Sequence, residues 1–156
     1  MKQDEYWLQY AIDLAKQCPS TDEAFAVGSV IIDKKGKKIA EGFSRETDAK
    51  IHAEESALQK VKRIKADLTG ATLYSSLEPC NKRLSRPKGC AQLIIEAGIT
   101  RVVFAAIEPP IFVPGHGVAR LQESGVAIAK LSTFEPQVIN LQSRIIKNIW
   151  KKQLSE

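Results

Sequence analysis

Residues 100–107, with the sequence TRVVFAAI, form a nearly continuous apolar run of strand type. A run without alternating polar residues suits a strand that is covered on both faces of a sheet. The segments before and after it, 90–98 and 117–125, have the character of short helices, and Gly98 suits the end of the first one. Strands that alternate with helices predict parallel neighbours joined by crossovers, and hence an α/β fold.

The remaining segments extend this pattern. Periodicity predicts further helices at 4–17, 52–65 and 135–153, and further strands at 26–33, 39–44, 70–77 and 126–131. We therefore expect a three-layer α/β/α sandwich around a mixed sheet of about five strands. No interior linker is visible, so residues 1–156 are predicted to form a single domain, with 134–156 as a C-terminal helix. The first helix is expected to face the core with Tyr6, Trp7, Tyr10, Ala11, Leu14 and Ala15.

The composition is that of an ordinary globular chain, with 44% hydrophobic and 26% charged residues. The N-terminal residues are charged and lack the apolar core of a signal peptide, and no window approaches ~18 consecutive apolar residues. These features predict a cytoplasmic protein without a membrane partner. A net charge of +5 without a basic tail is weak for nucleic-acid binding, but it permits an anionic small molecule.

Two of the three cysteines, Cys80 and Cys90, are placed after a predicted strand and at the start of a predicted helix. An odd number of cysteines without an export signal argues against a disulfide framework and favours metal binding or catalysis. His52 and Glu54 begin another helix, in the sequence IHAEES. One imidazole and two thiolates favour zinc, and three protein ligands leave a fourth position for water. We predict one Zn²⁺ per chain, held by His52, Cys80 and Cys90.

These residues also have plainer interpretations. His52 could simply lie near a helix start, where Glu54 favours the helix dipole. Both clustered cysteines could be buried structural residues. Cys18 is interpreted as a core or surface residue, and His116 as a fourth ligand, a residue at the rim of the pocket or an ordinary surface residue.

The pairing of HAE at 52–54 with LEPC at 77–80 and a second cysteine resembles the zinc-dependent cytidine/deoxycytidylate deaminase superfamily. The resemblance extends from the first helix to about Leu131 and implies a cytidine-deaminase-like fold. It further implies that an activated water attacks an amino-bearing ring carbon. Glu54 would be the catalytic residue that takes the proton of the water, protonates the ring nitrogen and delivers a proton to the leaving ammonia.

The spacing of the cysteines narrows the resemblance. Nine residues, 81–89, separate them, where the general signature has two. This long gap, together with AVGSVI, GATLYSSLEPC and IIEAGITRVVFA, is similar to the pyrimidine deaminase domain of riboflavin biosynthesis. The chain departs from that domain where the family contacts its substrate: Ala24 stands near an asparagine position, and Ser44 replaces a histidine.

The loop between the cysteines supplies candidate substrate ligands. Its basic side chains could meet a phosphate, or they could form a solvated surface; they are Lys82, Arg83, Arg86 and Lys88. His116 is included as a candidate at the rim of the pocket.

Two further pairs of candidates lie on the predicted sheet and on the loop before it. Phe25 and Ala26 lie where the loop before the first strand meets that strand, a place where the superfamily contacts substrate, and Phe25 could stack on a base or belong to the core. Ser75 and Ser76 precede LEPC, and their backbone carbonyls could accept a hydrogen bond from the leaving amino group.

Together these features predict a zinc-dependent hydrolytic deaminase of an amino-substituted nitrogen heterocycle, such as the diaminopyrimidine intermediate of riboflavin biosynthesis, with or without phosphate. A cytosine-type nucleoside or nucleotide deaminase and a deaminase of specialised metabolites are alternatives. A non-catalytic zinc module that binds nucleic acid or protein is an alternative of another class. A homo-oligomer stays open, because the final helix, with Trp150, can pack on its own core or on a second subunit.

Overall fold

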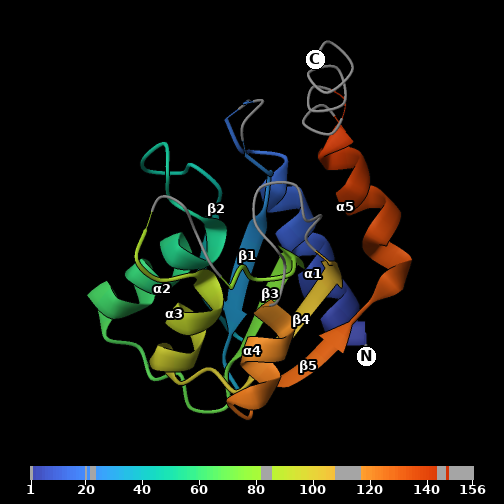
Figure 1. The fold of residues 1–156 in the computed structure, drawn as a ribbon. Coiled ribbons are helices and arrows are strands. Elements are labelled where there is room, and N and C mark those ends of the chain that lie inside the picture. Colours follow the sequence, from blue (N-terminus) through green and yellow to red (C-terminus); the bar gives the residue numbers. More distant parts are fainter. Residues whose placement is uncertain are drawn as a thin grey trace.

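The computed structural model describes residues 2–19, 21, 24–81, 86–107, 117–143 and 147. Its centre is a five-stranded sheet in the order β2-β1-β3-β4-β5 (Figure 1). The strands are β1 (Gly28–Ile32), β2 (Lys38–Phe43), β3 (Thr72–Leu77), β4 (Arg101–Ala106) and β5 (Ala127–Lys130). The α-helices are α1 (Lys2–Ala15), α2 (Ala53–Ile64), α3 (Cys90–Ala97), α4 (Gly117–Glu123) and α5 (Glu135–Leu141), and a 3-10 turn, η1 (Ser132–Phe134), precedes α5.

The sheet is mixed. β1 pairs antiparallel with β2 and with β3, whereas β3, β4 and β5 are mutually parallel. The apolar run at 100–107 therefore forms β4, a central strand whose residues from Val102 to Ala106 are all buried. The predicted α/β/α sandwich and its mixed sheet are confirmed.

A tight turn closes the β1–β2 hairpin. The side chain of Asp33 accepts hydrogen bonds from the backbone N–H groups of Lys35 and Lys37, at 2.9 Å each. Gly36 has a φ of 88°, in the left-handed region that glycine adopts without steric cost. The glycine in KKGKK is therefore required by the conformation of the turn.

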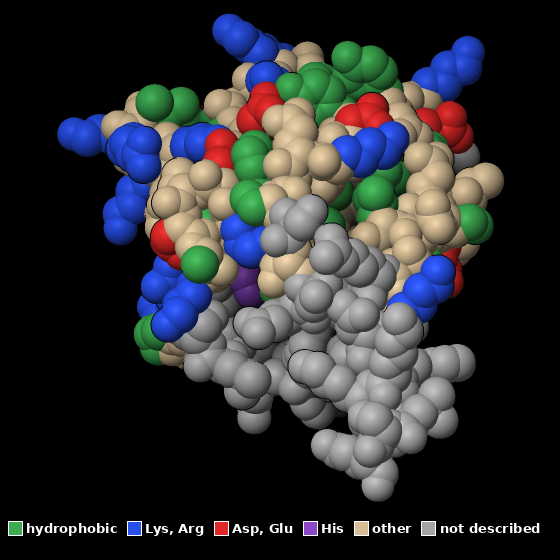
Figure 2. Space-filling view, turned by 90° about the horizontal axis from the view of Figure 1, so that it is seen from above, with side chains coloured by type: hydrophobic (Ala, Val, Ile, Leu, Met, Phe, Trp, Pro, Cys, Tyr) green, Lys and Arg blue, Asp and Glu red, His purple; other side chains and the backbone are tan. Residues whose placement is uncertain are grey.

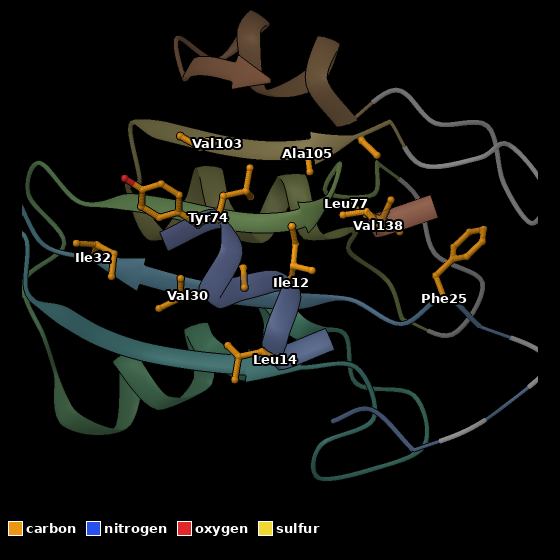
Figure 3. Close-up of a cluster of buried hydrophobic side chains, with 13 residues drawn as sticks. Ile12, Leu14, Phe25, Val30, Ile32, Tyr74, Leu77, Val103, Ala105 and Val138 are labelled. Atoms are coloured by element: carbon orange, nitrogen blue, oxygen red, sulfur yellow. The ribbon is translucent and has the colours of Figure 1, made fainter. Parts of the chain in front are cut away.

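Helices α1 and α5 cover one face of the sheet. The buried cluster on this face joins Leu8 and Ile12 of α1 to Val30, Val103 and, from α5, Val138. In Figure 3, Phe25 and Val138 lie at one end of this cluster, and Tyr74 and Ile32 lie at the other.

The predicted apolar stripe of the first helix is partly wrong. Leu8 and Ile12 are fully buried, whereas Tyr6 is 62% exposed. Tyr6 stacks edge-on against Trp7, and Trp7 stacks in the same way against Tyr10. The aromatic residues thus run along the margin of the helix, and the aliphatic residues face the sheet.

Helices α2, α3 and α4 cover the opposite face. Their buried cluster joins Ala57 and Val61 of α2, Ile94 of α3 and Leu121 of α4 to strand residues such as Ile31 and Val102. Gly42 allows α2 to lie close against β2, because a Cβ at this position would come within 2.5 Å of the Ala53 carbonyl oxygen. The beginning of α2 is therefore held directly against the sheet.

The strand directions bring several chain segments to one end of the sheet. β1 is antiparallel to β3, so the start of β1 lies beside the end of β3, with Ser29 opposite Ser75. The segment that follows β3 and the loop that precedes β1 therefore meet at this end (Figure 1). Figure 2 views the molecule from above this end, where lysine and arginine side chains lie at several points around the edge.

The C-terminal helix begins as the sequence predicts. α5 is described from Glu135 to Leu141, and most of the predicted continuation to residue 153, with Trp150, lies outside the described residues. Among the helices of the described part of the chain, none is long and apolar enough to cross a membrane.

Candidate metal centre and active site

Three side chains from three different segments converge at this end of the sheet. His52 immediately precedes α2, Cys80 follows β3, and Cys90 is the first residue of α3. Their potential ligand atoms all lie within 4.8 Å of one another. The Nδ1 atom of His52 lies 3.3 Å from the Sγ atom of Cys90 and 3.6 Å from that of Cys80. The structure thus brings together the three residues that the sequence predicts to be zinc ligands.

Local backbone geometry places each of these residues. His52 has extended backbone angles and caps α2, since its carbonyl oxygen accepts the Ser56 N–H at 2.9 Å and its own N–H donates to Glu55 Oε1 at 3.3 Å. The Cys80 carbonyl oxygen accepts the Ala91 N–H at 2.9 Å, which ties the end of the β3 segment to the start of α3. A Cβ at Gly89 would lie 2.2 Å from the Asn81 carbonyl oxygen, so this close return of the chain requires glycine.

The electrostatic environment favours a thiolate at Cys80. Hydrogen bonding with the Cys90 side chain, together with hydrogen bonding and charge interaction with His52, lowers the pKa of Cys80 well below its usual range, against the opposing effect of burial. The Cys90 N–H also donates to Cys80 Sγ, at 3.2 Å. A set of one half-buried imidazole and two buried sulfurs, with the Cys80 thiol readily ionised, fits Zn²⁺ by the chemistry of its donors.

Glu54 is a buried carboxyl group beside these residues. It is 3% exposed, and Ser75 Oγ donates a hydrogen bond to its Oε1 at 2.7 Å. Burial raises the pKa of Glu54, and the negative charge of Cys80 raises it further. The second residue of α2 therefore directs a carboxyl group into the interior, and this group binds a proton more readily than an exposed one does.

Ser29 adds an uncommitted polar group close to this carboxyl. It is fully buried on β1 opposite Ser75, and within the described residues its hydroxyl has no hydrogen-bond partner. Because opposite residues of an antiparallel pair face the same side of the sheet, the Ser29 and Ser75 side chains lie on the face of the sheet that α2 covers.

The candidate substrate residues on the sheet and on the loop before it have internal contacts. Phe25 is only 7% exposed and belongs to the core. Ser76 Oγ accepts the Gly28 N–H at 3.1 Å, and Ser75 holds Glu54. The backbone of Ala26 binds the side chain of Gln142 through two hydrogen bonds. Direct contacts of these residues with a substrate stay a prediction.

The described part of the basic loop pairs with carboxylates. Arg86 forms ion pairs with Asp48 at 3.1 Å and with Glu55 at 3.4 Å, and Lys88 pairs with Glu96 at 2.9 Å. Arg86 thereby links this loop to the segment that precedes His52. The candidates Lys82, Arg83 and His116 lie outside the described residues.

Two residues that the sequence analysis did not select shape this region. Arg45 has a φ of 60° and donates to the carbonyl oxygens of Pro19 and Phe25. Gln142 is fully buried after the end of α5. No motif marks either residue, because their partners are backbone groups that lie far away in the sequence. Cys18 is separate from the metal group, and its thiol contacts the Val27 carbonyl oxygen at 3.5 Å.

The H-x-E and P-C elements of the sequence, together with the second cysteine, thus meet at one point in an α/β/α sandwich. This combination is characteristic of the zinc-dependent deaminases, and the fold and the candidate site point to that class of protein. Comparison with known proteins assigns the family. The chain belongs to the family described as "Cytidine and deoxycytidylate deaminase zinc-binding region", whose model matches residues 1–106.

Similarity to individual proteins is more specific than the family assignment. The chain is 42% identical over 134 residues to the diaminohydroxyphosphoribosylamino-pyrimidine deaminase of Schizosaccharomyces pombe, which corresponds to 85% of this chain and 33% of that protein. It is 33% identical over 129 residues to the protein of the same name from Buchnera aphidicola, covering 80% of this chain and 82% of that protein.

A solved structure shows the same relationship. The diaminohydroxyphosphoribosylaminopyrimidine deaminase/5-amino-6-(5-phosphoribosylamino)uracil reductase of Thermotoga maritima superimposes with a TM-score of 0.84 at 35% identity, and the match covers 97% of this chain and 42% of that one. The chain spans about a third of the length of the S. pombe protein and about a third of the length of another relative, the riboflavin biosynthesis protein RibD of Escherichia coli.

Proposed function

We propose that this chain is a zinc-dependent hydrolytic deaminase that acts on an amino-substituted pyrimidine, most specifically the diaminopyrimidine ribonucleotide intermediate of riboflavin biosynthesis. The reaction consumes one water, replaces a ring amino group by an oxo group and releases ammonia. The observation that carries this proposal is the buried carboxyl group of Glu54 next to the triad of His52, Cys80 and Cys90. A centre with only a structural role would gain nothing from burying this acid.

In this proposal His52, Cys80 and Cys90 would hold one Zn²⁺, which as a Lewis acid would supply a nucleophilic water at neutral pH. Glu54 accepts one proton of the attacking water and passes it to the ring nitrogen. It then takes the second proton of the same water, from the hydroxyl group added to the ring carbon, and gives it to the amino group, which leaves as ammonia while the oxo group forms. Ser75 donates a hydrogen bond to Oε1 of Glu54 and thereby orients the carboxyl group for these transfers. The raised pKa of the carboxyl suits a group that must be protonated during part of the cycle.

The choice of substrate rests on the relatives. Those at 42% and 33% identity carry the name of a deaminase of a phosphoribosylated diaminopyrimidine. A phosphate would require cations at the mouth of the site, and Arg86 and Lys88 already pair with carboxylates. We therefore assign phosphate binding first to Lys82 and Arg83, the other two basic residues of the loop. His116 stays a proposed residue of the rim.

Two alternatives remain within deaminase chemistry. A cytosine-type nucleoside or nucleotide deaminase is consistent with the description of the family, and a deaminase of specialised metabolites is consistent with the departures at Ala24 and Ser44. A zinc module without activity, which would bind nucleic acid or protein, is the alternative of another class. The buried position of Glu54 disfavours it.

The test is the substitution Glu54→Gln, which preserves shape and removes the ionisable group. We expect kcat to fall by about 10²–10⁴-fold, the usual contribution of a general acid–base, while bound zinc stays near one per chain. Ammonia release is measured against a panel of aminopyrimidines and aminopurines, each with and without a ribose phosphate. The matched control is Glu123→Gln, at an exposed position of α4, which should be as active as the wild type.

Three outcomes separate the alternatives. Unchanged ammonia release by the Glu54 variant overturns the mechanism. A wild-type protein that binds zinc but deaminates nothing in the panel favours the non-catalytic module. Activity confined to cytosine compounds moves the substrate assignment to that alternative.

We also propose how the chain is organised. Residues 1–156 would act as one domain in the cytoplasm, with 134–156 as a C-terminal helix. Self-association through the part of this helix beyond α5 is a proposal that the mass of the protein in solution tests.

A further inference from the structure

A glutamine after the C-terminal end of α5 is fully buried. Gln142 follows Leu141, the last residue of α5, and its exposed fraction is 0%. Its side-chain amide donates to the Ala26 carbonyl oxygen at 2.7 Å, and its Oε1 accepts the Ala26 N–H at 2.8 Å. These two bonds reproduce the pairing of a β-bridge, although one partner is a side chain 116 residues away in the sequence.

The same loop is held from a second side by residues that follow β2. Arg45 Nη1 donates to the Phe25 carbonyl oxygen at 3.1 Å. Ser44 Oγ accepts the Val27 N–H at 3.0 Å, and the Ser44 N–H donates to the Val27 carbonyl oxygen at 3.0 Å. The backbone of 25–27 is thus fixed between the end of β2 and α5. Val138 of α5 belongs to the same buried cluster as Phe25, and both lie at the same end of it (Figure 3).

This loop is connected to the candidate catalytic residue through a short series of contacts. The residue after Val27, Gly28, donates its N–H to Ser76 Oγ at 3.1 Å. The next residue, Ser29, pairs with Ser75, whose hydroxyl binds Glu54. Ser29 lies opposite Ser75, the residue that binds the Glu54 carboxyl group, and Ala26 precedes Ser29 by three residues. The loop is therefore connected to Glu54 through only a few residues.

The chemistry of the contact indicates that Gln142 fixes the position of the Ala26 backbone. A buried side-chain amide is costly when its nitrogen or its oxygen lacks a partner, and here the backbone of a single residue pairs with both atoms. A loop at the end of a strand could instead satisfy its backbone with water. The glutamine removes that freedom and fixes one conformation, so displacement of Ala26 would leave a buried amide unpaired.

We propose that Gln142 is a positioning residue for substrate binding, which holds the 25–27 loop at the end of the sheet where the metal centre lies, so that the backbone of the loop meets the aminopyrimidine ring. This inference rests on the proposed deaminase function. It gives the residue after α5 a part in the site, although the metal ligands come from other segments of the chain. The zinc ligands themselves do not depend on this contact.

The experiment compares Gln142→Met with the wild-type protein, both loaded with zinc. Methionine keeps the length of the side chain and removes both hydrogen bonds. We expect KM for the aminopyrimidine substrate to rise about tenfold with kcat changed less than about threefold, because the lost contact affects binding of substrate and transition state alike. We also expect faster hydrogen exchange at the Ala26 amide and an unchanged zinc content.

The matched control is Gln137→Met on the same helix. Gln137 is exposed and exchanges hydrogen bonds with Gln9 of α1 at 3.1 and 3.2 Å, away from the 25–27 loop. The Gln137→Met variant tests whether any loosening of α5 is enough to raise KM. Its KM should equal that of the wild type. If the methionine variant does not fold, Gln142→Glu replaces it, because the carboxylate keeps the bond to the Ala26 N–H and loses the bond to the carbonyl oxygen.

The outcomes are distinguishable from those of the proposed function. A variant with a lowered Tm but a wild-type KM overturns the positioning role, since a merely structural residue behaves in that way. Unchanged exchange at Ala26 overturns it as well. If the wild-type protein itself releases no ammonia, the proposed function fails, and exchange at Ala26 still measures whether Gln142 holds the loop.

Discussion

One hydroxyl group orients the buried carboxyl of the site. Ser75 donates to Glu54 at 2.7 Å, whereas Ser29, opposite it on β1, has no partner within the described residues. The two serines are equally buried and lie on the same face of the sheet, so they differ chiefly in their contact with Glu54. Substituting each serine in turn therefore measures what the hydrogen bond between Ser75 and Glu54 contributes.

We predict that Ser75→Ala lowers kcat about tenfold or more, because Glu54 can then rotate away from the geometry of proton transfer. Ser29→Ala should leave kcat within about twofold and should not lower Tm, since no protein hydrogen bond is lost. Steady-state kinetics and thermal unfolding of the two variants measure these effects. Equal kinetic losses in both would contradict the assigned role of Ser75.

The three cysteines are predicted to differ in their effect on zinc. Cys90→Ser should reduce bound zinc from about one per chain towards zero, because it removes a ligand from the buried triad. Cys18→Ser should retain the metal, since its thiol contacts the Val27 carbonyl oxygen and is not one of the three grouped ligands. Elemental analysis of the purified variants decides this, and loss of zinc from the Cys18 variant would show that the ligand set is wrong.

At the residue scale, the sequence was informative where chemistry and helix position agree. A histidine at one helix start and a cysteine at another, with a second cysteine after a strand, can be placed together because strands and helices in α/β folds alternate in a known way. Gln142 could not be found in this manner. Glutamine is usually exposed, and its partner is a backbone group that only the tertiary fold brings near.

At the scale of elements, the order and type of the segments follow from periodicity, and observed ends differ from the predicted ones by a few residues, apart from the end of the C-terminal helix, which lies outside the described residues. The first helix shows the limit of this approach. Its aromatic and aliphatic residues both recur at helical spacing, so the sequence alone could not show that Leu8 and Ile12 face the sheet while Tyr6 is exposed.

Helix α1 is also held to the sheet by an ion pair near its beginning. Arg101 of β4 donates two hydrogen bonds to Asp4, at 2.9 and 2.6 Å, and the Tyr74 hydroxyl donates a third at 2.6 Å. The hydrogen bonds from Arg101 contribute most to lowering the pKa of Asp4 from 3.8 to about 2. A single carboxylate thus joins one helix to two strands.

This contact makes part of the stability dependent on pH. The folded state has the lower pKa, so the unfolded chain binds the proton more tightly, and the contribution is complete above about pH 4 and disappears as the pH falls towards 2. We expect Asp4→Asn to reduce the free energy of unfolding at pH 7 by about 1–2 kcal/mol, a value reduced for the solvent around Arg101.

Urea unfolding at several pH values measures this loss, and the difference between Asp4→Asn and the wild type should shrink between pH 4 and pH 2. The control is Asp13→Asn on the same helix, whose partner Lys16 is exposed, and it should change stability by less than about 0.5 kcal/mol at any pH. A difference for Asp4→Asn that stays constant across this range would contradict the assignment.

For the molecule as a whole, the metal centre joins three separate segments of the chain. Its ligands come from the start of α2, the end of the β3 segment and the start of α3. Metal bound at such a point stabilises the folded state by mass action, because the unfolded chain does not present the same ligand set.

We therefore predict that removing zinc with a chelator lowers Tm, and that adding zinc restores it. Free zinc at 100 times the dissociation constant corresponds to about 2.7 kcal/mol of stabilisation. Calorimetry of the metal-free and zinc-loaded protein tests this, with Cys90→Ser as the control that should not respond to zinc. Identical transitions for the two forms of the wild type would exclude a stabilising metal.

The mixed sheet separates the two ends of the molecule. The turn around Gly36 and the segments that enter β3, β4 and β5 lie together at the end opposite the metal centre, because Ile32 pairs with Thr72 and Arg101 pairs with both Thr72 and Ala127. A fluorescent dye or an affinity handle attached at the Gly36 turn would therefore stand a full strand length from the ligands. The hairpin offers a place to immobilise or label the chain while its chemistry is followed undisturbed.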